Sequence, residues 1–365
     1  MINELLSGSV PLCEKIKEAR LPVLLYGTGD GAEKIIAFLA ENGIVPQGVF
    51  ASDSFVRGQS FAGLRVMKLA EAEETFGRFC AVICFGMDAE YKTAVAALRA
   101  RGHCVFAPDL PLFGKEIFDS DFVKANSESI ERVYSLLADE VSRSVFRAVL
   151  EFRITGDPAV LDVCGGGEEP RCFYTRGGRH IDAGAYDGDT AIEFARKSGG
   201  NYSEIIAFEP DRVNYRKLKE NPLLPPRVVA ENKLCGEKCG KVPFAAGEGR
   251  GSHADETATE YAECVTVDSY CGFTHTDSEA PPVGSIKIDA EGMDAGVLYG
   301  AVNTLWCCKS NVCVAVYHRA GDIFELPLLL RRYDPKYKLY LRKKPCLPAW
   351  DLFLYAVRED IQSFL

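Results

Sequence analysis

Acidic residues and glycines gather in one turn in the second half of the chain. A short apolar strand leads into it, through the residues Arg179-His-Ile-Asp-Ala-Gly-Ala-Tyr-Asp-Gly-Asp-Thr190, and a second apolar strand ends in Glu209-Pro-Asp211. A strand, a glycine turn, a helix and a strand that ends in a carboxylate form the βαβ layout of a nucleoside-binding site. Gly184 and Gly188 would let the backbone turn tightly and approach a ligand, and Glu209 could hold both hydroxyls of a ribose.

The charge of this turn separates it from a dinucleotide-binding turn. Asp182, Asp187 and Asp189 crowd the place where a pyrophosphate would need hydrogen-bond donors. Because opposite charges attract, an adenosine that carries a positive centre fits this field better than an anion does. S-adenosylmethionine is such a ligand, and we predict that it is the cofactor.

The same segment predicts the cofactor contacts. The backbone at Gly184 and Ala185 would pass beneath the methionine part, while Asp182 would support the loop or accept from the amino group. Asp211 would lie beside the adenine edge, and Asn232 ends the third strand, where such folds often contact adenine. The predicted cofactor-binding residues are Asp182, Ala183, Gly184, Ala185, Asp187, Gly188, Thr190, Glu209, Pro210, Asp211 and Asn232.

A second acidic group follows a later strand. Lys287, Asp289 and Glu291 alternate along it and into the turn after it, so their side chains should point to one side of the sheet. Burying three ionisable groups is costly without partners, which favours a site over a core. Asp289 or Glu291 could accept the proton of an acceptor hydroxyl or hold a neighbouring sugar hydroxyl, with Lys287 paired to either. His318, at the end of the next strand, is the other candidate base because an imidazole titrates near neutrality.

The same acids and histidine could instead serve a metal. Two carboxylates and one imidazole, here Asp289, Glu291 and His318, make an acceptable ligand set for a divalent cation. The sequence does not separate metal-assisted deprotonation from simple base catalysis. Purely structural roles also stay open for three of these residues. Asp182 could be a capping carboxylate, Glu209 a solvated charge at the end of a strand, and His318 a histidine bonded to a backbone carbonyl. We assign no metal ligand, and the predicted catalytic residues are Asp289, Glu291, His318 and Lys287.

At these residues the chain resembles the FkbM family of methyltransferases. Besides the turn at 179–190, Gly284-Ser-Ile-Lys-Ile-Asp-Ala-Glu-Gly292 is similar to the family's other characteristic segment, and Val316-Tyr-His-Arg319 through Tyr337-Lys-Leu-Tyr-Leu-Arg342 to its closing strands. The three stretches together cover roughly residues 150–357. The resemblance implies a seven-stranded methyltransferase fold. It also implies transfer of a methyl group from S-adenosylmethionine to a hydroxyl of a sugar, a glycan intermediate or a natural product.

Alternating elements must position these residues. Apolar periodicity in the second half predicts strands at 180–183, 204–208, 227–231, 285–289, 311–317, 337–342 and 351–357, with others near 242 and 264. It predicts helices at 189–197, 211–220, 294–306 and 323–333. This alternation indicates an α/β protein with a mostly parallel, Rossmann-like sheet, helices on both faces and an antiparallel edge.

A smaller Rossmann-like pattern begins the chain. A buried strand runs from Pro22 into the glycine turn Gly27-Thr-Gly-Asp-Gly-Ala32, and Asp53 ends the second strand, where it would suit a ribose contact. The turn could bind NAD or a sugar nucleotide, or the module could only present a surface. An enzyme that uses this turn, and an adenosine-binding scaffold without catalysis, are therefore the rival hypotheses. Residues 116–155 are predicted to be mainly helical.

We predict a nucleotide- or sugar-nucleotide-binding-like module at 1–115, a helical connector at 116–155 and a methyltransferase domain at 156–365. A chain of 365 residues with 47% hydrophobic residues can supply two cores. The net charge of −10 argues against nucleic acid as a partner. The amino terminus lacks the basic start and the long apolar core of a signal peptide, and no apolar run reaches the length of about 20 residues that spans a bilayer. We therefore predict a cytoplasmic protein without a membrane span.

The cysteines and the acceptor complete the expectations. The 14 cysteines include no pair of C-x-x-C units, which favours reduced, buried thiols. The acceptor is predicted to be a small molecule or a glycan. Homo-oligomerisation is left open.

Overall fold

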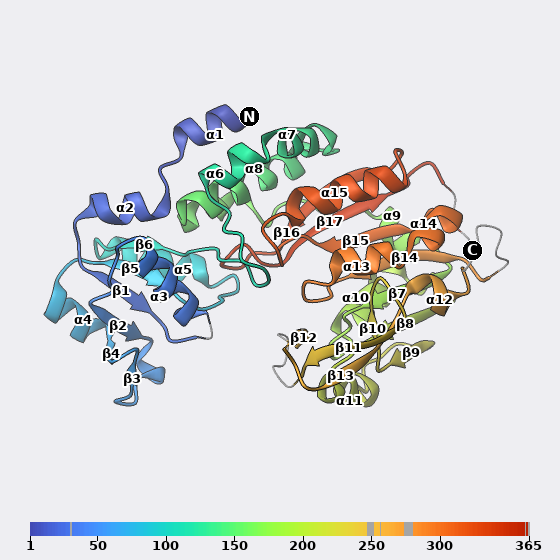
Figure 1. The fold of residues 1–365 in the computed structure, drawn as a ribbon, viewed down its shortest axis with the longest axis horizontal. Helices are drawn as coiled ribbons and strands as arrows, with labels where there is room; N and C mark the ends of the chain where they lie inside the picture. Colours follow the sequence, from blue (N-terminus) through green and yellow to red (C-terminus); the bar gives the residue numbers. More distant parts are fainter. Residues whose placement is uncertain (30, 247–251, 256, 274–279, 362, 364–365) are drawn as a thin grey trace.

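The molecule is built on two α/β sheets. The structure, a computed structural model, describes residues 1–29, 31–246, 252–255, 257–273, 280–361 and 363. The two sheets lie next to each other, and a group of helices that includes α7, α8 and α15 lies along the top of the view (Figure 1). The predicted α/β class, with a larger sheet in the second half and a smaller one in the first, is confirmed.

The first sheet has six strands in the order β3-β4-β2-β1-β5-β6. Its parallel strands are β1 (Val23–Tyr26), β2 (Gly48–Ala51), β4 (Leu64–Lys68), β5 (Cys80–Ile83) and β6 (Cys104–Phe106). At the edge, β3 (Ser60–Phe61) pairs antiparallel with β4. The helical elements of this half are α1 (Ile2–Gly8), α2 (Leu12–Ala19), α3 (Ala32–Glu41), η1 (Asp53–Phe55), α4 (Leu69–Phe76) and α5 (Tyr91–Ala100). Strands β2 and β5 are wholly buried, as expected of a parallel sheet covered on both faces.

Residues 116–155 are mainly helical, as the sequence predicts. They form α6 (Ser120–Ala125), α7 (Ser127–Leu136) and α8 (Glu140–Thr155), followed by η2 (Pro158–Val163) and α9 (Cys172–Thr175). The side chain of Asp139 caps α8 by accepting from the Ser142 N–H, and Gly156 ends it in the left-handed conformation. In the described part of the chain, no helix is long and apolar enough to cross a bilayer. The domain boundaries at 115 and 155 stay predictions.

The second sheet has seven strands in the order β16-β17-β15-β14-β7-β8-β9. The parallel strands are β7 (Arg179–Ala183), β8 (Glu204–Phe208), β9 (Val228–Glu231), β14 (Val283–Ile288) and β15 (Asn311–Ala315). The antiparallel edge is formed by β16 (Lys338–Lys343) and β17 (Leu352–Val357). The order runs outward in one direction from β7 and in the other from β14. Such a reversal leaves a crevice beyond the carboxyl ends of these two strands.

The helices of this half are α10 (Asp189–Ser198), α11 (Arg212–Glu220), α12 (Val267–Cys271), α13 (Asp294–Tyr299), α14 (Val302–Cys308) and α15 (Asp322–Tyr333). The single helix predicted at 294–306 is therefore wrong, since the chain breaks between α13 and α14. At the break, Gly300 lies directly against the backbone of Gly236, where no Cβ would fit. The prediction missed this because the contact partner lies far away in the sequence.

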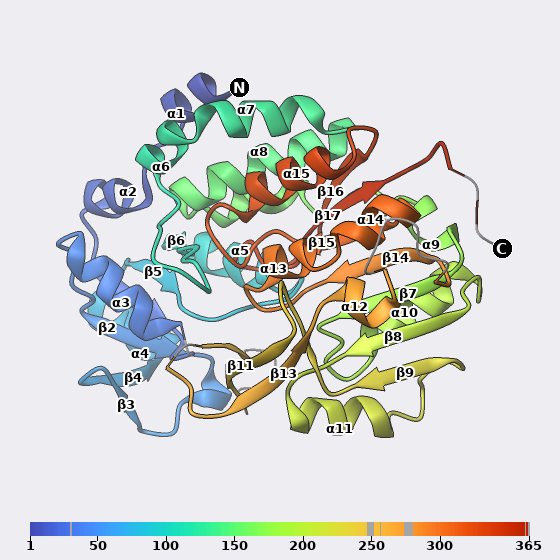
Figure 2. The ribbon, with the colours of Figure 1, turned by 45° about the vertical axis from the view of Figure 1, so that its right-hand side comes forward.

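Between β9 and β14 the chain forms a small separate sheet. Its strands are β10 (Leu234–Cys235), β11 (Gly240–Ala245), β12 (His253–Ala254) and β13 (Tyr261–Val265). Leu234, Phe244 and Cys264 make its core, against which Met293 packs. Figure 2 shows β11 and β13 to the left of β9, the edge strand of the seven-stranded sheet. The sequence predicts strands near 242 and 264 but not that they leave the main sheet.

Candidate active site

The predicted site residues converge beyond the carboxyl ends of β7, β8 and β14. A cleft lies there, with a volume of about 960 Å³ that includes its part open to solvent. The seven-stranded sheet supplies one wall and the small sheet another. The predicted residues that line the cleft are Ala183, Gly184, Thr190, Glu209, Pro210, Lys287, Asp289 and Glu291.

Glu209 directly follows β8 and is 6% exposed. Its Oε1 accepts from the Asp211 N–H and its Oε2 from the Tyr186 N–H, both at 2.9 Å. Burial raises the pKa of Glu209 to about 7, although these two hydrogen bonds act in the opposite direction. Glu209 is therefore not a solvated strand-end charge. It is a buried carboxylate held in one orientation at the wall of the cleft.

Asp182 supports the turn from below. It is fully buried, accepts from the Thr190 hydroxyl at 2.5 Å and lies 3.1 Å from the ammonium of Lys287. Lys287 also donates to the Gly184 carbonyl at 2.6 Å. Burial raises the pKa of Asp182, and the nearby ammonium opposes that rise. The expected pairing of Lys287 with Asp289 or Glu291 is wrong, because Lys287 pairs with Asp182 across adjacent strands.

Two glycines of the turn are required by packing. Gly184 has φ +89° and Gly188 has φ +92°, a region that favours glycine. A Cβ on Gly184 would overlap the carbonyl oxygen of Asp289, and one on Gly188 would lie 2.7 Å from the side chain of Leu224. The space that these glycines leave is therefore filled by protein. Gly184 itself lines the cleft, so the approach of its backbone to the cofactor stays a prediction.

Besides Asp182 and Gly188, four more predicted cofactor contacts do not line the cleft. Ala185 is buried with Leu218 in a small core, and Asp187 accepts from the Asp189 N–H at 3.3 Å. Asp211 caps α11 by accepting from two backbone N–H groups and also accepts from the Ser252 hydroxyl. Asn232 donates to the carbonyls of Glu209 and Pro210. These side chains brace the cleft wall and do not face the cleft. The residues concerned are Ala185, Asp187, Asp211 and Asn232.

Much of the lining comes from residues that the sequence analysis did not select. Tyr186 lies between two predicted residues, so the motif itself could have shown it. The others belong to α10 and α11, to the small sheet and to the segments that border the antiparallel edge. They are Asp189, Asn214, Lys233, Leu234, Cys235, Phe244, Ser252, His253, Tyr317, Lys344, Asp351 and Phe353, and the cleft is also lined by Phe208 of β8 and Ala290 after β14. No local pattern marks them, because only folding brings these segments together.

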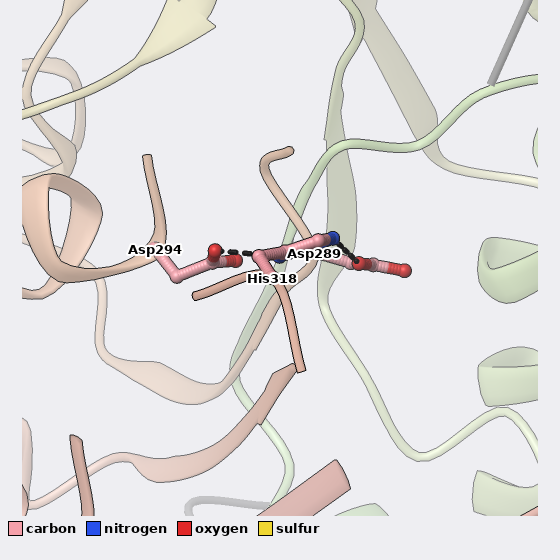
Figure 3. A group of neighbouring side chains, drawn as sticks. All are labelled: Asp289, Asp294 and His318. Atoms are coloured by element: carbon pink, nitrogen blue, oxygen red, sulfur yellow. Dashed lines mark hydrogen bonds and ion pairs between the residues drawn. The ribbon is translucent and has the colours of Figure 1, made fainter. Parts of the chain in front are cut away.

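His318 lies buried between carboxylates (Figure 3). Its Nδ1 is 2.7 Å from Asp294 Oδ2, while its Nε2 is 3.4 Å from Asp289 Oδ1 and 3.6 Å from Glu291 Oε2. The alternative of a histidine bonded to a backbone carbonyl is therefore wrong. Asp294 also accepts from the Ala290 N–H at 3.0 Å. The sequence analysis missed Asp294, although an acid in the first turn of a helix right after the motif was a usable signal.

The ionisable groups of this cluster shift one another's pKa values. Burial alone would lower the pKa of His318, but Asp294, Asp289 and Glu291 raise it to about 10. Burial raises the pKa of Glu291 to about 8 and, with a contribution from Asp294, that of Asp322 to about 7. His318 is thus an imidazolium at neutral pH in the protein alone. A neutral histidine base, as the sequence suggests, is not its resting state.

The segment between β6 and α6 braces this cluster. The Phe113 N–H donates to the His318 carbonyl at 3.1 Å, and the two rings lie 5.9 Å apart. The Phe113 ring also fills the place that a side chain on Gly292 would take. The guanidinium of Arg319 holds the same turn by donating to the Gly292 carbonyl at 3.2 Å. Residues far apart in the sequence therefore fix the turn that carries Glu291.

The glycine turn of the first half is packed against its own chain. Gly27 has φ +91°, and the ring of Phe85 occupies the space beside it, while the Phe85 Cβ and the Cys84 carbonyl oxygen lie beside Gly29. Gly86 lies against Trp350 from the second half of the chain. Asp53 is exposed at the start of η1, and residue 30 of the turn lies outside the described residues. Nucleotide binding here stays a prediction that this packing does not support.

Comparison with known proteins decides the family. Residues 182–337 match the model of the methyltransferase FkbM domain. This segment is an FkbM methyltransferase domain. The resemblance seen in the sequence is confirmed, and the chain is an S-adenosylmethionine-dependent methyltransferase. Its cofactor is thus the one predicted from the acidic turn.

Solved structures show how far the fold extends. The methyltransferase FkbM from Methylobacillus flagellatus KT is 17% identical, with a TM-score of 0.70 over 98% of both chains. The chain therefore shares that fold along almost its whole length. Aeropyrum pernix fibrillarin in complex with S-adenosylmethionine is 14% identical over 55% of this chain and 73% of its own, with a TM-score of 0.32. A Bacillus cereus O-methyltransferase in complex with SAH is 13% identical over 65% and 100%, with a TM-score of 0.30. These last two likenesses are weak. No curated protein matches the chain.

Proposed function

We propose that this methyltransferase acts on a hydroxyl of a sugar, a glycan intermediate or a natural product. The observation that carries the proposal is the group Asp289, Glu291 and His318: the two acids line the cleft, and the buried imidazole lies 3.4 Å and 3.6 Å from their carboxylates. A hydroxyl must lose its proton as it is methylated, and carboxylates within hydrogen-bond reach can assist. An O-methyltransferase therefore fits this end of the cleft.

The other end suits the cofactor. A buried carboxylate, Glu209, lines it next to Tyr186, Asp189 and Asn214. An ionised carboxylate can accept from ribose hydroxyls, and the acidic wall favours a ligand of positive charge. When bound, S-adenosylmethionine supplies a methyl group on a positively charged sulfur. Glu209 would then orient the ribose, while Lys287 and Asp182 hold the turn beneath it.

The acceptor side combines aromatic and polar groups. Tyr317 and Phe353 lie 6.2 Å apart with their rings at 81°, and Lys344 and Asp351 line the same region. Mixed linings of this kind are usual for polar organic ligands. The net charge of −10 disfavours nucleic acid as the acceptor. The cytoplasmic location stays a prediction.

Methyl transfer from labelled S-adenosylmethionine would test the proposal. The purified chain would be offered sugars, sugar nucleotides and polyhydroxylated natural products, with amines and tRNA as controls. We expect label in a product that is stable to base, as a methyl ether is, and only in hydroxyl acceptors. Label in the amines or tRNA alone would contradict the proposal.

Donor binding should depend on pH through Glu209. We expect the affinity for S-adenosylhomocysteine to be highest above about pH 7 and to fall by up to about tenfold per pH unit below it. The reason is that burial raises the pKa of Glu209 to about 7, and the ribose hydroxyls need the ionised carboxylate as acceptor. Isothermal titration calorimetry between about pH 5.5 and 8 measures this. Glu209→Gln should bind weakly with no such slope, and a flat profile for the parent protein would refute the assignment.

A further inference from the structure

A buried nitrogen without a hydrogen-bond partner marks the catalytic cluster. His318 is fully buried, and its Nε2 has no hydrogen-bond partner within the ranges that the structure describes. The nitrogen faces Asp289 Oδ1 at 3.4 Å and Glu291 Oε2 at 3.6 Å. These separations exceed ordinary hydrogen bonds. Both acids line the cleft, while the imidazole is fully buried and is not among the lining residues.

We propose that His318 Nε2, Asp289 and Glu291 bind a divalent metal cation. A cation bound at about 2.0–2.2 Å by each ligand keeps its ligand atoms about 3 to 3.5 Å apart. The distances from Nε2 to the two oxygens, 3.4 Å and 3.6 Å, are close to that range. Asp289 and His318 also belong, with Asp294, to a group whose possible ligand atoms lie within 4.8 Å of one another. The role of the cation rests on the proposed function, because it would act on the acceptor hydroxyl.

The other ring nitrogen of His318, Nδ1, already has a carboxylate partner. Histidines that bind metals commonly donate their other ring N–H to a carboxylate, which fixes the ring. Here Nδ1 lies 2.7 Å from Asp294 Oδ2, as Figure 3 shows. Asp294 is itself held by the Ala290 N–H, and the Tyr317 hydroxyl donates to Asp289 Oδ1 at 3.2 Å. Two of the three ligands are thus oriented by partners outside the set.

The charge around the cluster also favours a cation. One imidazole interacts with four carboxylates, those of Asp289, Glu291, Asp294 and Asp322. The neighbouring ammonium of Lys287 is committed to Asp182. Arg319 offsets part of the charge on Asp322, while its guanidinium donates to a backbone carbonyl. Negative charge therefore remains in excess even when the imidazole is protonated, and a divalent cation would offset it.

The ligand chemistry indicates the class of cation. Two carboxylates and one imidazole suit Mn²⁺ or Mg²⁺ better than a thiophilic metal. Three protein ligands leave coordination positions open toward the cleft, where water or an acceptor hydroxyl could bind. A hydroxyl bound to such a cation is a stronger acid, so it loses its proton at a lower pH.

Mn²⁺ titration of the chelator-treated, full-length protein tests the site directly. Calorimetry and the electron paramagnetic resonance signal of free Mn²⁺ should both report about one bound ion per chain. Asp289→Asn and His318→Gln should weaken binding at least about 100-fold, and Asp294→Asn about 10- to 100-fold. Asp189→Asn is the matched control, since it removes a carboxylate from the cofactor side of the same cleft. It should leave Mn²⁺ binding unchanged.

The outcomes separate this site from the proposed function. Thermal stabilisation by S-adenosylhomocysteine is measured on the same samples. If that ligand binds but Mn²⁺ does not at about 1 mM, or if the cluster variants still bind Mn²⁺, the cation site is refuted and the methyltransferase assignment stands. If Mn²⁺ binds as expected but no hydroxyl compound is methylated, the proposed function fails instead. Should His318→Gln not fold, Glu291→Gln replaces it, because the Glu291 side chain is 27% exposed.

Discussion

Replacing Glu209 by alanine should weaken the binding of S-adenosylhomocysteine about 10- to 100-fold. One hydrogen bond to a charged group contributes about 1.5–3 kcal/mol, and a tenfold change in affinity corresponds to about 1.4 kcal/mol, so this range matches the loss of one such bond to the ribose. The substitution also leaves the N–H groups of Tyr186 and Asp211 without the oxygens that now accept from them. The cleft would therefore lose a contact to the ribose, and the backbone at Tyr186 and Asp211 would no longer be held by Glu209. Calorimetry at about pH 8, where the parent carboxylate is ionised, gives the measurement.

Two further variants make the result specific. Glu209→Gln keeps the shape and one acceptor, so its loss of affinity should be smaller than that of Glu209→Ala. Asp187→Ala removes a carboxylate from the same turn that does not line the cleft, and it should change the affinity less than about threefold. If Asp187→Ala were as damaging as Glu209→Ala, the effect would reflect the net charge of the turn and not a ribose contact.

Replacing Lys287 by methionine should lower the free energy of unfolding by about 3–5 kcal/mol, the usual cost of breaking a buried ion pair from one side. Asp182 is 0% exposed, and the lysine ammonium lies 3.1 Å from it and 2.6 Å from the Gly184 carbonyl. Without the ammonium a buried carboxylate is left unpaired. Urea unfolding monitored by circular dichroism measures the change.

The loss should also depend on pH, with a definite sign. The folded-state pKa of Asp182 is already raised by burial, and removal of the ammonium raises it further. An acid whose pKa is raised in the folded state binds its proton more tightly there than in the unfolded state. The variant's loss in free energy of unfolding should therefore be largest at high pH and shrink as the pH falls. Lys233→Met is the control: it removes a lysine that lines the cleft, is 25% exposed and pairs with Glu231, and should cost about 1 kcal/mol or less. A pH-independent deficit would show that lost packing, and not the bare carboxylate, explains the result.

Local residue patterns predicted the elements well. The strands predicted for the seven-stranded sheet are found close to their expected positions, and its central strands β7 and β14 are buried along their whole length. The exception, one helix where there are two, arose where Gly300 meets Gly236 across the fold. The ion-pair partners of individual side chains were predicted less well than the helices and strands. Lys287 was assigned to the acids on its own strand, but it bonds Asp182 on the neighbouring strand.

The sequence by itself determined the α/β class, the family and the segments that carry the chemistry, because each depends on residues close together in the chain. Only the tertiary structure decided which side chains face the cleft. Asp211 caps α11, and Asn232 donates to the backbone of Glu209. Tyr317, which follows β15, and Lys344 and Asp351, between β16 and β17, line the cleft instead. It also decided the state of His318, since a pKa depends on burial and on charges brought near by folding. Sequence spacing fixes neither burial nor those neighbours.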